Sequence, residues 1–287
     1  MSTGPSIVNT PRGSPLAALQ EWFADWGAVV IASMVTVGDM SLFAARIISW
    51  LIARRPRKET LLITFYQIGV LSLPVVALTG TFIGMVLAVQ SYYQFHQIGL
   101  ESRLGAVINM TLFRELGPVL AATMLAGRVG SAMAAELGTM KVTEQIDALA
   151  AMGANPIHYL AVPRLLACVL LIPMLTVMAD LMGVVGGYLF SDYVLQIDPH
   201  FYWKNSQEFV GAWDFFYGII KSLFFGATIA IISCHRGFNC GAGAEGVGRA
   251  ATAAFVYSFC IILALDLFVG MVLDNVYYMI WTEGPTF

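Results

Sequence analysis

The sequence predicts an all-α integral membrane protein: an N-terminal interfacial helix, five transmembrane helices, and a cytoplasmic coupling helix between the second and third. Three observations support this fold class. Of the 287 residues, 58% are hydrophobic and only 11% are charged. The mean hydropathy is +0.76. Apolar runs recur with the length of about 20 residues that a helix needs to cross a bilayer. Soluble domains have about 25% charged residues, so this composition excludes them.

Charge and cysteine content exclude further classes. The formal net charge is -3 and the pI is about 5.8, so we expect no nucleic-acid partner. The cysteines mostly lie in or beside apolar runs, which argues against a disulfide framework. These are Cys168, Cys234, Cys240 and Cys260. Cys234, His235 and Cys240 do not have the spacing of a structural zinc site, so we expect no metal.

The N-terminal part has two regions. Residues 1–15 are polar and rich in turn formers, so we expect them to be disordered and not to form a cleaved secretory signal. Residues 16–58 are mostly apolar, but Asp39 and Arg46 lie on one helical face, which favours a helix in the membrane interface. By length, residues 27–53 could instead span the bilayer, although charged side chains in a lone span are costly.

Residues 59–287 form the main membrane domain. The transmembrane helices are expected at about 61–95, 105–137, 165–191, 213–234 and 250–280. The second helix is longer than a ~30 Å hydrocarbon core requires. Gly117 and Pro118 predict a bend in it, because proline lacks a backbone donor. Between the third and fourth helices, residues 192–210 are expected to form a polar, aromatic loop.

The second transmembrane helix carries two stripes of small residues at every fourth position. Small residues let helix backbones approach closely in lipid. The stripes contain Gly127, Gly130, Ser131, Ala134, Ala135 and Gly138. This spacing fits packing within one subunit and also fits a dimer contact.

A short polar helix is expected at about 143–153, between the second and third spans. Thr143 is its predicted N-cap, Glu144 and Asp147 place negative charge in its first turn, and Gly153 ends it. A helix of about ten residues is marginal in water and needs a docking surface. That surface is either the chain's own spans or a separate cytoplasmic protein.

Basic residues are distributed unequally between the loops. One side carries Arg54, Arg55, Arg57, Lys58, Lys141, Arg164, Arg236 and Arg249, and the other carries Arg103 and Lys204. The positive-inside rule places the first side in the cytoplasm. The N-terminus is then cytoplasmic, and the C-terminus lies on the opposite side of the membrane.

The sequence contains no GxxxxGK[ST] motif, so any nucleotide chemistry is expected on another polypeptide. Residues 241–246, GAGAEG, match GxGxxG, but they follow a membrane span and no strand, so we expect a flexible cytoplasmic turn. No nucleophile and base pair stands out. We therefore expect neither enzyme activity nor a cofactor on this chain.

Ionisable residues inside the predicted spans are the main candidates for a functional site. They are Arg114, Glu115, Arg128, Lys221 and Asp266. Such groups are costly in lipid and either line a cavity or pair with one another. Internal salt bridges are one explanation. A mixed cluster facing an apolar chamber would instead suit a zwitterionic or anionic lipid headgroup.

Several motifs resemble one family. RELGPVLAA, AGRVGSA, AAELG and TEQIDAL, within residues 114–164, are similar to the MlaE-type permeases of bacterial lipid-transport ABC systems, which include the YrbE proteins of Mce systems. GVLSLPVVALTGTFIGMVLAVQ, IIKSLFFGATIAIIS and GAEGVGRA extend the similarity over about 60–275. Motifs of this length are more specific than short patterns that recur by chance.

The resemblance implies a homodimeric permease that moves phospholipid or a similar lipid between the inner membrane and an MCE-domain lipid-binding protein. A separate ABC ATPase would bind ATP and Mg, and a small cytoplasmic regulatory subunit is a further candidate partner. The implied lipid-binding residues are Arg114, Glu115, Lys221, Asp266, Leu87 and Tyr92, the last two by position only. The implied coupling residues are Glu144, Gln145, Asp147 and Leu149.

Two other functions stay open. An ion-gradient-driven secondary transporter could use Asp180, Lys221 and Asp266 as a relay. Such proteins usually show two matching halves, and no internal repeat is visible. A non-transporting membrane scaffold would anchor partners without moving lipid. In that case, neutralising Arg114 or Lys221 would leave lipid flux unchanged.

Overall fold

The computed structural model describes residues 15–54, 58–100 and 103–280, and within these ranges every regular element is a helix. The predicted all-α class is therefore confirmed. The chain divides into two compact units, residues 1–45 and 46–287. The stretch that we expect to be disordered lies outside the described residues apart from Pro15, and so do Arg55 and Arg57.

The first unit is formed by most of helix α1 (Pro15–Ala53), which continues into the second unit. Its described side chains are largely exposed and apolar, and Trp22 and Trp26 form an edge-on pair with centroids 5.8 Å apart. Residues Ala24–Ala53 are long and apolar enough to cross a membrane. The placement of this helix in the interface therefore stays a prediction.

Five further segments of the described residues meet the same length and hydropathy criteria, and they correspond to the predicted spans. They are Lys58–Gln97, Leu104–Val142, Ile157–Tyr193, Ala212–Phe238 and Gly243–Ile280. All are longer than a flat hydrocarbon core needs. The third and fifth begin earlier than predicted, at Ile157 and at Gly243.

Several of these segments are built from shorter pieces. The first contains α2 (Lys58–Ile68), a 3₁₀ turn (Val70–Ser72) and α3 (Leu73–Gln97). The second contains α4 (Leu104–Thr111), α5 (Gly117–Leu125) and α6 (Ser131–Val142), joined by π-helical turns at Leu112–Leu116 and Ala126–Gly130. The third is a π-helical turn (Ile157–Ala161) followed by α8 (Val162–Tyr193). The fourth is α10 (Ala212–Phe238), and the fifth is α11 (Gly243–Ile280).

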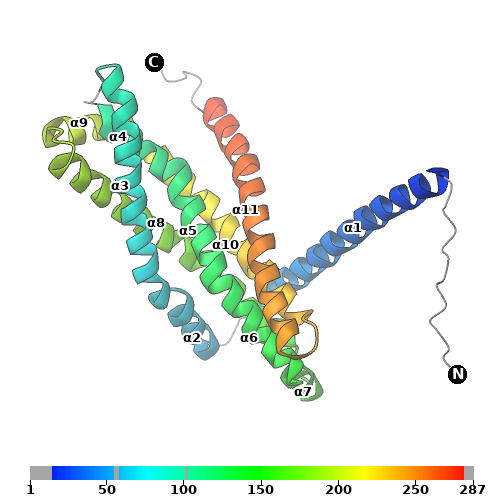
Figure 1. Ribbon diagram of the computed structural model, residues 1–287. Helices are drawn as coiled ribbons and strands as arrows, with labels where there is room; N and C mark the ends of the chain where they lie inside the picture. The colour runs from blue at the N-terminus through cyan, green and yellow to red at the C-terminus, as the bar shows by residue number, and fades with distance from the viewer. Residues whose placement is uncertain (1–14, 55–57, 101–102, 281–287) are drawn as a thin grey trace, which may run out of the picture. The chain divides into compact units, whose positions relative to one another are not determined.

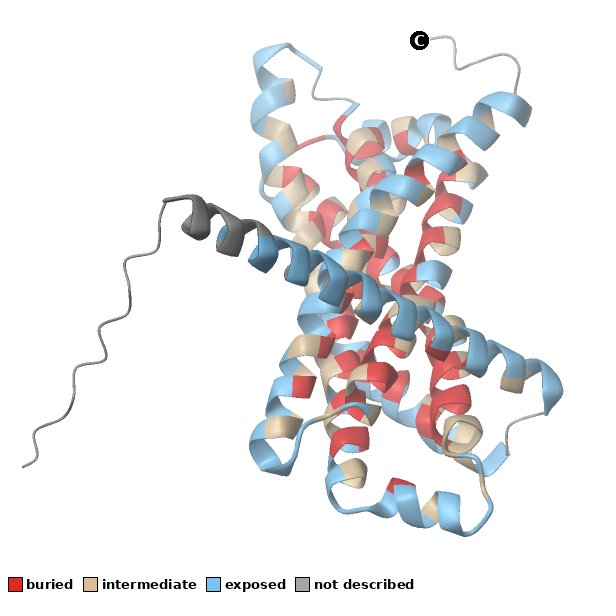
Figure 2. Ribbon diagram, turned by 90° about the vertical axis from the view of Figure 1, so that its right-hand side faces the viewer, coloured by how far each residue is buried: buried red, intermediate tan, exposed pale blue. Residues whose placement is uncertain are grey.

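Within the second unit, the long helices run alongside one another (Figure 1). Helix α8 contacts α3 and α10, and α10 also contacts α6 and α11. Buried residues follow the interior of this bundle (Figure 2). Helices α4 and α9 (Pro199–Phe209) contact each other at one end, and α7 (Gln145–Ala151) lies beside α6 at the other.

Glycines bring α3 and α8 into backbone contact. Gly80 faces the main chain of Ala179, and Gly84 faces that of Gly183. A Cβ atom added to either of these α3 glycines would collide with that backbone. The pairing therefore relies on small residues, which is the usual way for helices to pack closely in lipid.

The small-residue stripes of the second span also pack within the chain. Gly130 lies against Ser233 of α10, and Gly127 lies beside Phe255 of α11. Gly138 faces Cys240, whose thiol contacts the Gly138 carbonyl oxygen at 3.3 Å. Packing inside one subunit therefore accounts for the buried stripe of Gly130, Ala134 and Gly138, whereas Gly127, Ser131 and Ala135 stay half-buried.

The predicted N-cap of the coupling helix, Thr143, is wrong by one residue. Thr143 closes α6, where its hydroxyl donates to the carbonyl oxygen of Thr139, and it caps nothing in α7. Glu144 adopts a left-handed backbone with φ of 59°, and the next helix begins only at Gln145. Gly153 has φ of 80° and follows the helix, as predicted.

Two predicted loops are partly helical. The stretch 192–210 contains α9, because Asp198 accepts a hydrogen bond from the His200 amide and Pro199 occupies the first turn. These are ordinary helix-start signals. The GAGAEG stretch is also mostly helical, since α11 begins at Gly243. The predicted turn is therefore limited to the residues before it.

Candidate functional site

Lys221 is the buried centre of the candidate site. Its side chain on α10 is 1% exposed, and its ammonium nitrogen lies 2.8 Å from Glu115 Oε2. The same nitrogen forms an ion pair with Asp266 Oδ1 at 2.8 Å. The angle between these groups does not meet the geometry of a hydrogen bond. A buried ammonium needs such partners to offset its desolvation. Residues from the second, fourth and fifth spans therefore meet here in internal ion pairs, one of the two arrangements that the sequence left open.

Backbone geometry adds a third partner for Lys221. Pro118 has no N–H, so it cannot donate to the carbonyl of Arg114 four residues earlier. Lys221 Nζ donates to that carbonyl oxygen at 3.3 Å. The region is a π-helical turn, Leu112–Leu116, of a kind that is frequent at functional sites. The Gly117–Pro118 irregularity is thus part of the site itself.

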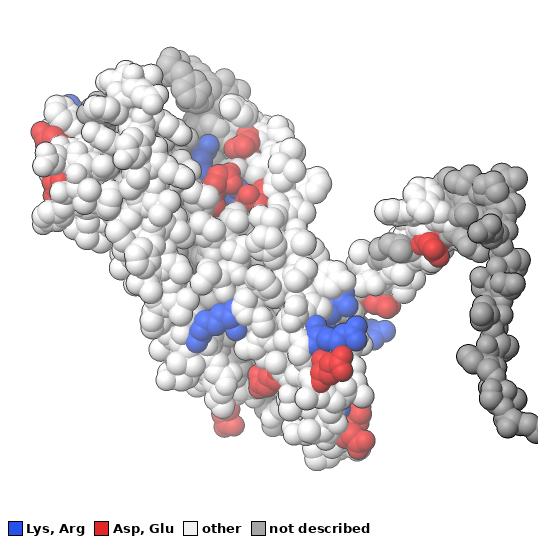
Figure 3. Space-filling model, in the orientation of Figure 1, with Lys and Arg blue, Asp and Glu red and all other residues white. Residues whose placement is uncertain are grey.

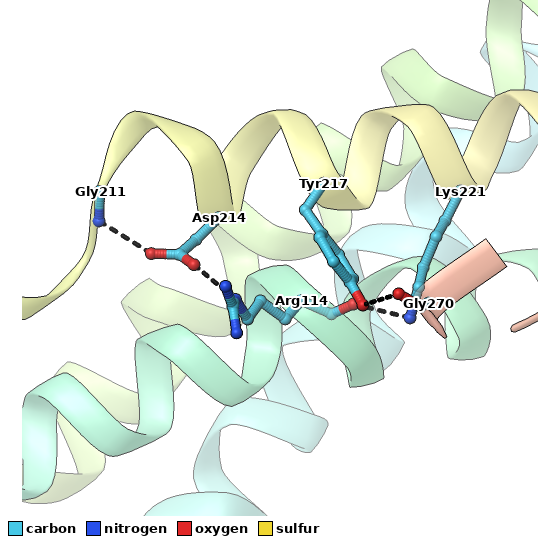
Figure 4. A network of polar contacts seen from close by, with 6 residues as sticks. All are labelled: Arg114, Gly211, Asp214, Tyr217, Lys221 and Gly270. Atoms are coloured by element: carbon cyan, nitrogen blue, oxygen red, sulfur yellow. Dashed lines mark hydrogen bonds and ion pairs between the residues drawn. The ribbon is translucent and has the colours of Figure 1, made fainter. Parts of the chain in front are cut away.

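Arg114 is held by a residue that was not predicted. Its Nε donates to Asp214 Oδ1 at 2.5 Å, and the other carboxylate oxygen of Asp214 accepts from the Gly211 amide at 2.9 Å. Tyr217 lies between the two cations, 5.2 Å from the Arg114 guanidinium carbon and 4.7 Å from Lys221 Nζ, measured to the ring centroid. Figure 4 shows Asp214, Tyr217 and Lys221 extending from α10 toward Arg114.

The sequence contained a signal for these additional residues. Asp214, Tyr217 and Lys221 recur at intervals of three and four, which places them on one helical face. Tyr217 is buried, and its hydroxyl donates to the Gly270 carbonyl oxygen on α11 at 3.2 Å. A search for polar partners on the Lys221 face would have found both residues.

Part of the charged cluster reaches the surface. The side chains of Glu115 and Arg114 are 47% and 26% exposed, whereas those of Asp214 and Lys221 are almost fully buried. In Figure 3, charged side chains on this face occur in a few groups with uncharged surface between them. A half-exposed carboxylate next to a partly exposed guanidinium can bind an ammonium and a phosphate side by side.

Leu87 and Tyr92 lie away from this charged cluster. Both pack at the edge of a separate apolar cluster, formed by Ala88, Leu104, Ile108, Ile197 and Tyr202. Tyr92 also stacks on His96, with ring centroids 5.3 Å apart. Contact between these two side chains and an acyl chain stays a prediction.

The coupling candidates lie at the start of α7. Glu144 and Gln145 are exposed, and Asp147 pairs with Lys141 Nζ at 3.0 Å. Ile146 is the buried anchor that attaches this helix to its own chain. Leu149 is half-buried, and the rest of α7 faces outward. The helix therefore has one face docked and another available.

Two further charged residues from the sequence lie outside the cluster. Arg128 belongs to the π-helical turn Ala126–Gly130 and donates to the hydroxyl of Ser72. Asp180 is buried in α8 with Oδ1 against Gly117, which does not place it in a relay with Lys221. Among residues 15–54, 58–100 and 103–280, no group of three metal-ligating side chains comes together.

Comparison with known proteins places this architecture in a family. The family model described as Permease MlaE matches residues 61–272. A probable ABC transporter permease protein of Rickettsia felis is 45% identical over 229 residues, which cover 79% of this chain and 88% of that protein. A further relative is the intermembrane phospholipid transport system permease protein MlaE of Haemophilus influenzae. It is 36% identical over 202 residues, which cover 70% of this chain and 77% of that protein.

A relative from a plant has a similar level of identity. Protein TRIGALACTOSYLDIACYLGLYCEROL 1, chloroplastic, of Arabidopsis thaliana is 42% identical over 198 residues, which cover 69% of this chain and 57% of that protein. The matched region contains all the candidate lipid-binding and coupling residues. The resemblance seen in the sequence motifs is confirmed, and the chain belongs to the MlaE permease family.

Proposed function

We propose that this chain is the membrane subunit of an ABC transporter that moves phospholipid or a similar lipid, driven by ATP hydrolysis on a separate subunit. The observation that carries the proposal is that one family match spans both the charged cluster and α7. The names of the relatives support it, because they describe ABC transporter permeases and, in Haemophilus influenzae, phospholipid transport.

The charged cluster is the proposed headgroup contact. Lys221 is fully engaged by Glu115 and Asp266, so its role is to hold the carboxylates in place. The exposed parts of Arg114 and Glu115 then meet the lipid. Arg114 would bind a headgroup phosphate and Glu115 a headgroup ammonium, a pairing that suits a zwitterionic phospholipid. Leu87 and Tyr92 would contact the acyl chains further along the outer half.

Charge distribution supports an orientation with α7 in the cytoplasm. The end of the bundle that carries α7 also carries Lys58, Lys141 and Arg249, whereas Arg103 and Lys204 lie beside α4 and α9. By the positive-inside rule, the first end faces the cytoplasm of a bacterial inner membrane. The C-terminus is then periplasmic, and the N-terminus is cytoplasmic with α1 lying in the interface as predicted from the sequence.

The proposed coupling path runs from α7 to the charged cluster. Helix α7 is attached to α6 and leads into the third span, so a push on α7 reaches both. Helix α6 packs on α10 and α11, which carry Lys221 and Asp266. A shift of α6 would therefore move those helices relative to the π-helical turn that carries Arg114 and Glu115.

The proposed complex contains other subunits. Two copies of this chain would form a homodimer that binds two ABC ATPase subunits, which carry ATP and Mg. An MCE-domain lipid-binding protein would receive or deliver lipid on the outer side, and a small cytoplasmic regulatory subunit is a further candidate. Glu144, Gln145, Asp147 and Leu149 would form the contact with the ATPase.

An affinity purification from native membranes in mild detergent tests the assignment. We expect mass spectrometry of the purified material to find an ATP-binding subunit, an MCE-domain protein and phospholipid. Recovery of this chain without an ATPase, even after cross-linking, would contradict the ABC assignment and favour a gradient-driven carrier.

Charge reversal on α7 tests the coupling contact. Glu144→Lys combined with Asp147→Lys should prevent copurification of the ATPase and abolish lipid transport. Glu208→Lys, an exposed change on α9 at the other end of the bundle, is the control and should retain both. If the α7 double variant keeps the ATPase and transports lipid normally, the coupling residues are assigned wrongly.

A further inference from the structure

A second site lies nearer the α7 end of the bundle than the Lys221 cluster does. A cavity of about 380 Å³ is bounded by α2, the following 3₁₀ turn, α6 and the start of α8. Its walls include Ile68, Leu71, Arg128, Met133, Glu136 and Arg164. We call this space the α2–α6 cavity. Its volume is within the range of sites for small ligands or lipid headgroups.

Arg164 is a buried cation with an unfilled hydrogen-bonding position. Its side chain is 9% exposed, and Nη2 lies 2.9 Å from Glu136 Oε2. Its Nη1 is buried and has no hydrogen-bond partner among the described residues. A buried donor without a partner costs about 1–3 kcal/mol, and more when the group is charged. A rotation of the guanidinium that turns Nη1 toward the cavity would let an anionic oxygen remove that cost.

Arg128 supplies a second cation to the same cavity. It lies in the π-helical turn Ala126–Gly130, and one of its nitrogens donates to Ser72, which orients the side chain. The cavity lining thus carries two guanidinium groups and one carboxylate. Guanidinium groups bind phosphate oxygens through charge-assisted hydrogen bonds, often in pairs.

The rest of the lining suits the apolar part of a lipid. Ile68, Leu71 and Met133 border the cavity, and Leu71 is 46% exposed at its edge. A free inorganic phosphate would gain nothing from these side chains. A phosphate attached to a glycerol and acyl chains would cover apolar surface with them, at about 25 cal/mol per Å² removed from water.

The position of the cavity along the bilayer normal agrees with the depth at which lipid headgroups lie. The span Lys58–Gln97 has 40 residues, about 60 Å at 1.5 Å per residue, and the hydrocarbon core is ~30 Å thick. If this helix is centred in the bilayer, roughly ten residues at each end lie at headgroup level or beyond. Thr64 and Arg164, which line the cavity, lie within that distance of their helix starts, and Arg128, 14 residues from the end of its span at Val142, lies about one turn deeper.

We propose that the α2–α6 cavity binds the phosphate of an anionic phospholipid from the cytoplasmic leaflet, with Arg164 and Arg128 as its donors. Basic pockets between transmembrane helices on the cytoplasmic side commonly bind such headgroups. This site is separate from the Lys221 cluster and needs no transport to be occupied. Only its assignment to the cytoplasmic leaflet depends on the orientation proposed above.

The test is native mass spectrometry of the full chain in detergent during titration with phosphatidylglycerol. Arg128→Gln should weaken binding of one lipid per chain about tenfold, because a charge-assisted hydrogen bond is lost. Arg164→Lys keeps a cation beside Glu136 but lacks the second planar donor, so it should also weaken binding of that lipid. Arg249→Gln, an exposed arginine outside the cavity, is the control and should bind like the wild type.

Because a charge variant could lose lipid by misfolding, a second variant blocks the cavity and keeps every charged side chain. Ala132 is exposed at the cavity wall, and Ala132→Trp should block the space and displace the lipid. Unchanged lipid binding in both Ala132→Trp and Arg128→Gln would overturn the proposal. Competition separates the possible ligands: excess inorganic phosphate or phosphate-free diacylglycerol should not displace the lipid. Displacement by phosphate alone would refute the lipid assignment, and displacement by diacylglycerol would refute recognition of the phosphate.

Discussion

The ammonium group of Lys221 donates a hydrogen bond to the main-chain carbonyl of Arg114, 3.3 Å away. Pro118 cannot donate to that carbonyl, so a side chain from α10 replaces a helical hydrogen bond of the second span. The same ammonium pairs with two carboxylates. One buried lysine therefore joins three spans and stabilises an irregular backbone.

Lys221→Met should destabilise the chain severely. The substitution keeps the volume but leaves Glu115 and Asp266 without their cation. Leaving a fully buried charge unpaired typically costs about 3–5 kcal/mol, and solvent around the half-exposed Glu115 lowers the expected cost toward the bottom of that range. We expect a markedly lower midpoint of thermal unfolding in detergent. The triple variant Lys221→Met, Glu115→Gln, Asp266→Asn should recover much of the loss, because no charge is left unpaired. Equal midpoints for Lys221→Met and the wild type would show that the pairs contribute nothing.

Arg114 and Asp214 should be energetically coupled. Asp214 accepts from Arg114 and from the Gly211 amide at the start of α10, so Asp214→Ala should cost more than Arg114→Ala. A double-mutant cycle measured by thermal unfolding should give a coupling free energy of about 1 kcal/mol or more. The two effects would simply add if the contact were only incidental. Ser222→Ala, on the same helix but outside this pair, should be additive with Arg114→Ala.

Gly117→Ala tests the contact between the π-helical turn and α8. A Cβ at this position would collide with the buried carboxyl group of Asp180. Overpacking of this kind typically costs about 1–3 kcal/mol. Asp180→Ala opens space at the same point, so the double variant should be more stable than the two single effects predict. Strict additivity of the unfolding free energies would contradict this steric account.

Much of the bundle could be predicted because hydropathy and length identify membrane spans without knowledge of contacts. Lys221, Glu115 and Asp266 could be selected for a similar reason, since charge at such depth demands a partner. Their meeting point depended on packing that periodicity alone does not determine. Asp214 was missed although its spacing from Lys221 places both side chains on one helical face.

Local backbone choices were harder to predict. Helix α7 begins one residue later than predicted because Glu144 adopts a left-handed backbone conformation. That conformation is uncommon outside glycine and asparagine, so a glutamate at this position does not predict it. A hydropathy profile also does not detect the π-helical turns around Arg114 and Arg128. A π-helical turn closes its hydrogen bond over one more residue than an α-helical turn, and this change needs no change in amino-acid composition. The α2–α6 cavity depends on such a turn and was therefore not predicted.

The contact between α3 and α8 should tolerate almost no added side chain. Gly84 faces the main chain of Gly183 and Gly187, and backbone atoms cannot rotate away as a flexible side chain can. Gly84→Ala should therefore force the two helices apart and cost about 2 kcal/mol or more. Gly248→Ala, in α11, is the matched control, since nothing lies within 4 Å of its added Cβ. That control should be neutral or stabilise slightly, because alanine favours helix over glycine by about 0.5–1 kcal/mol. Thermal unfolding of both variants in the same detergent decides the matter: if Gly84→Ala unfolds at the wild-type midpoint, α3 and α8 are not in the backbone contact described above.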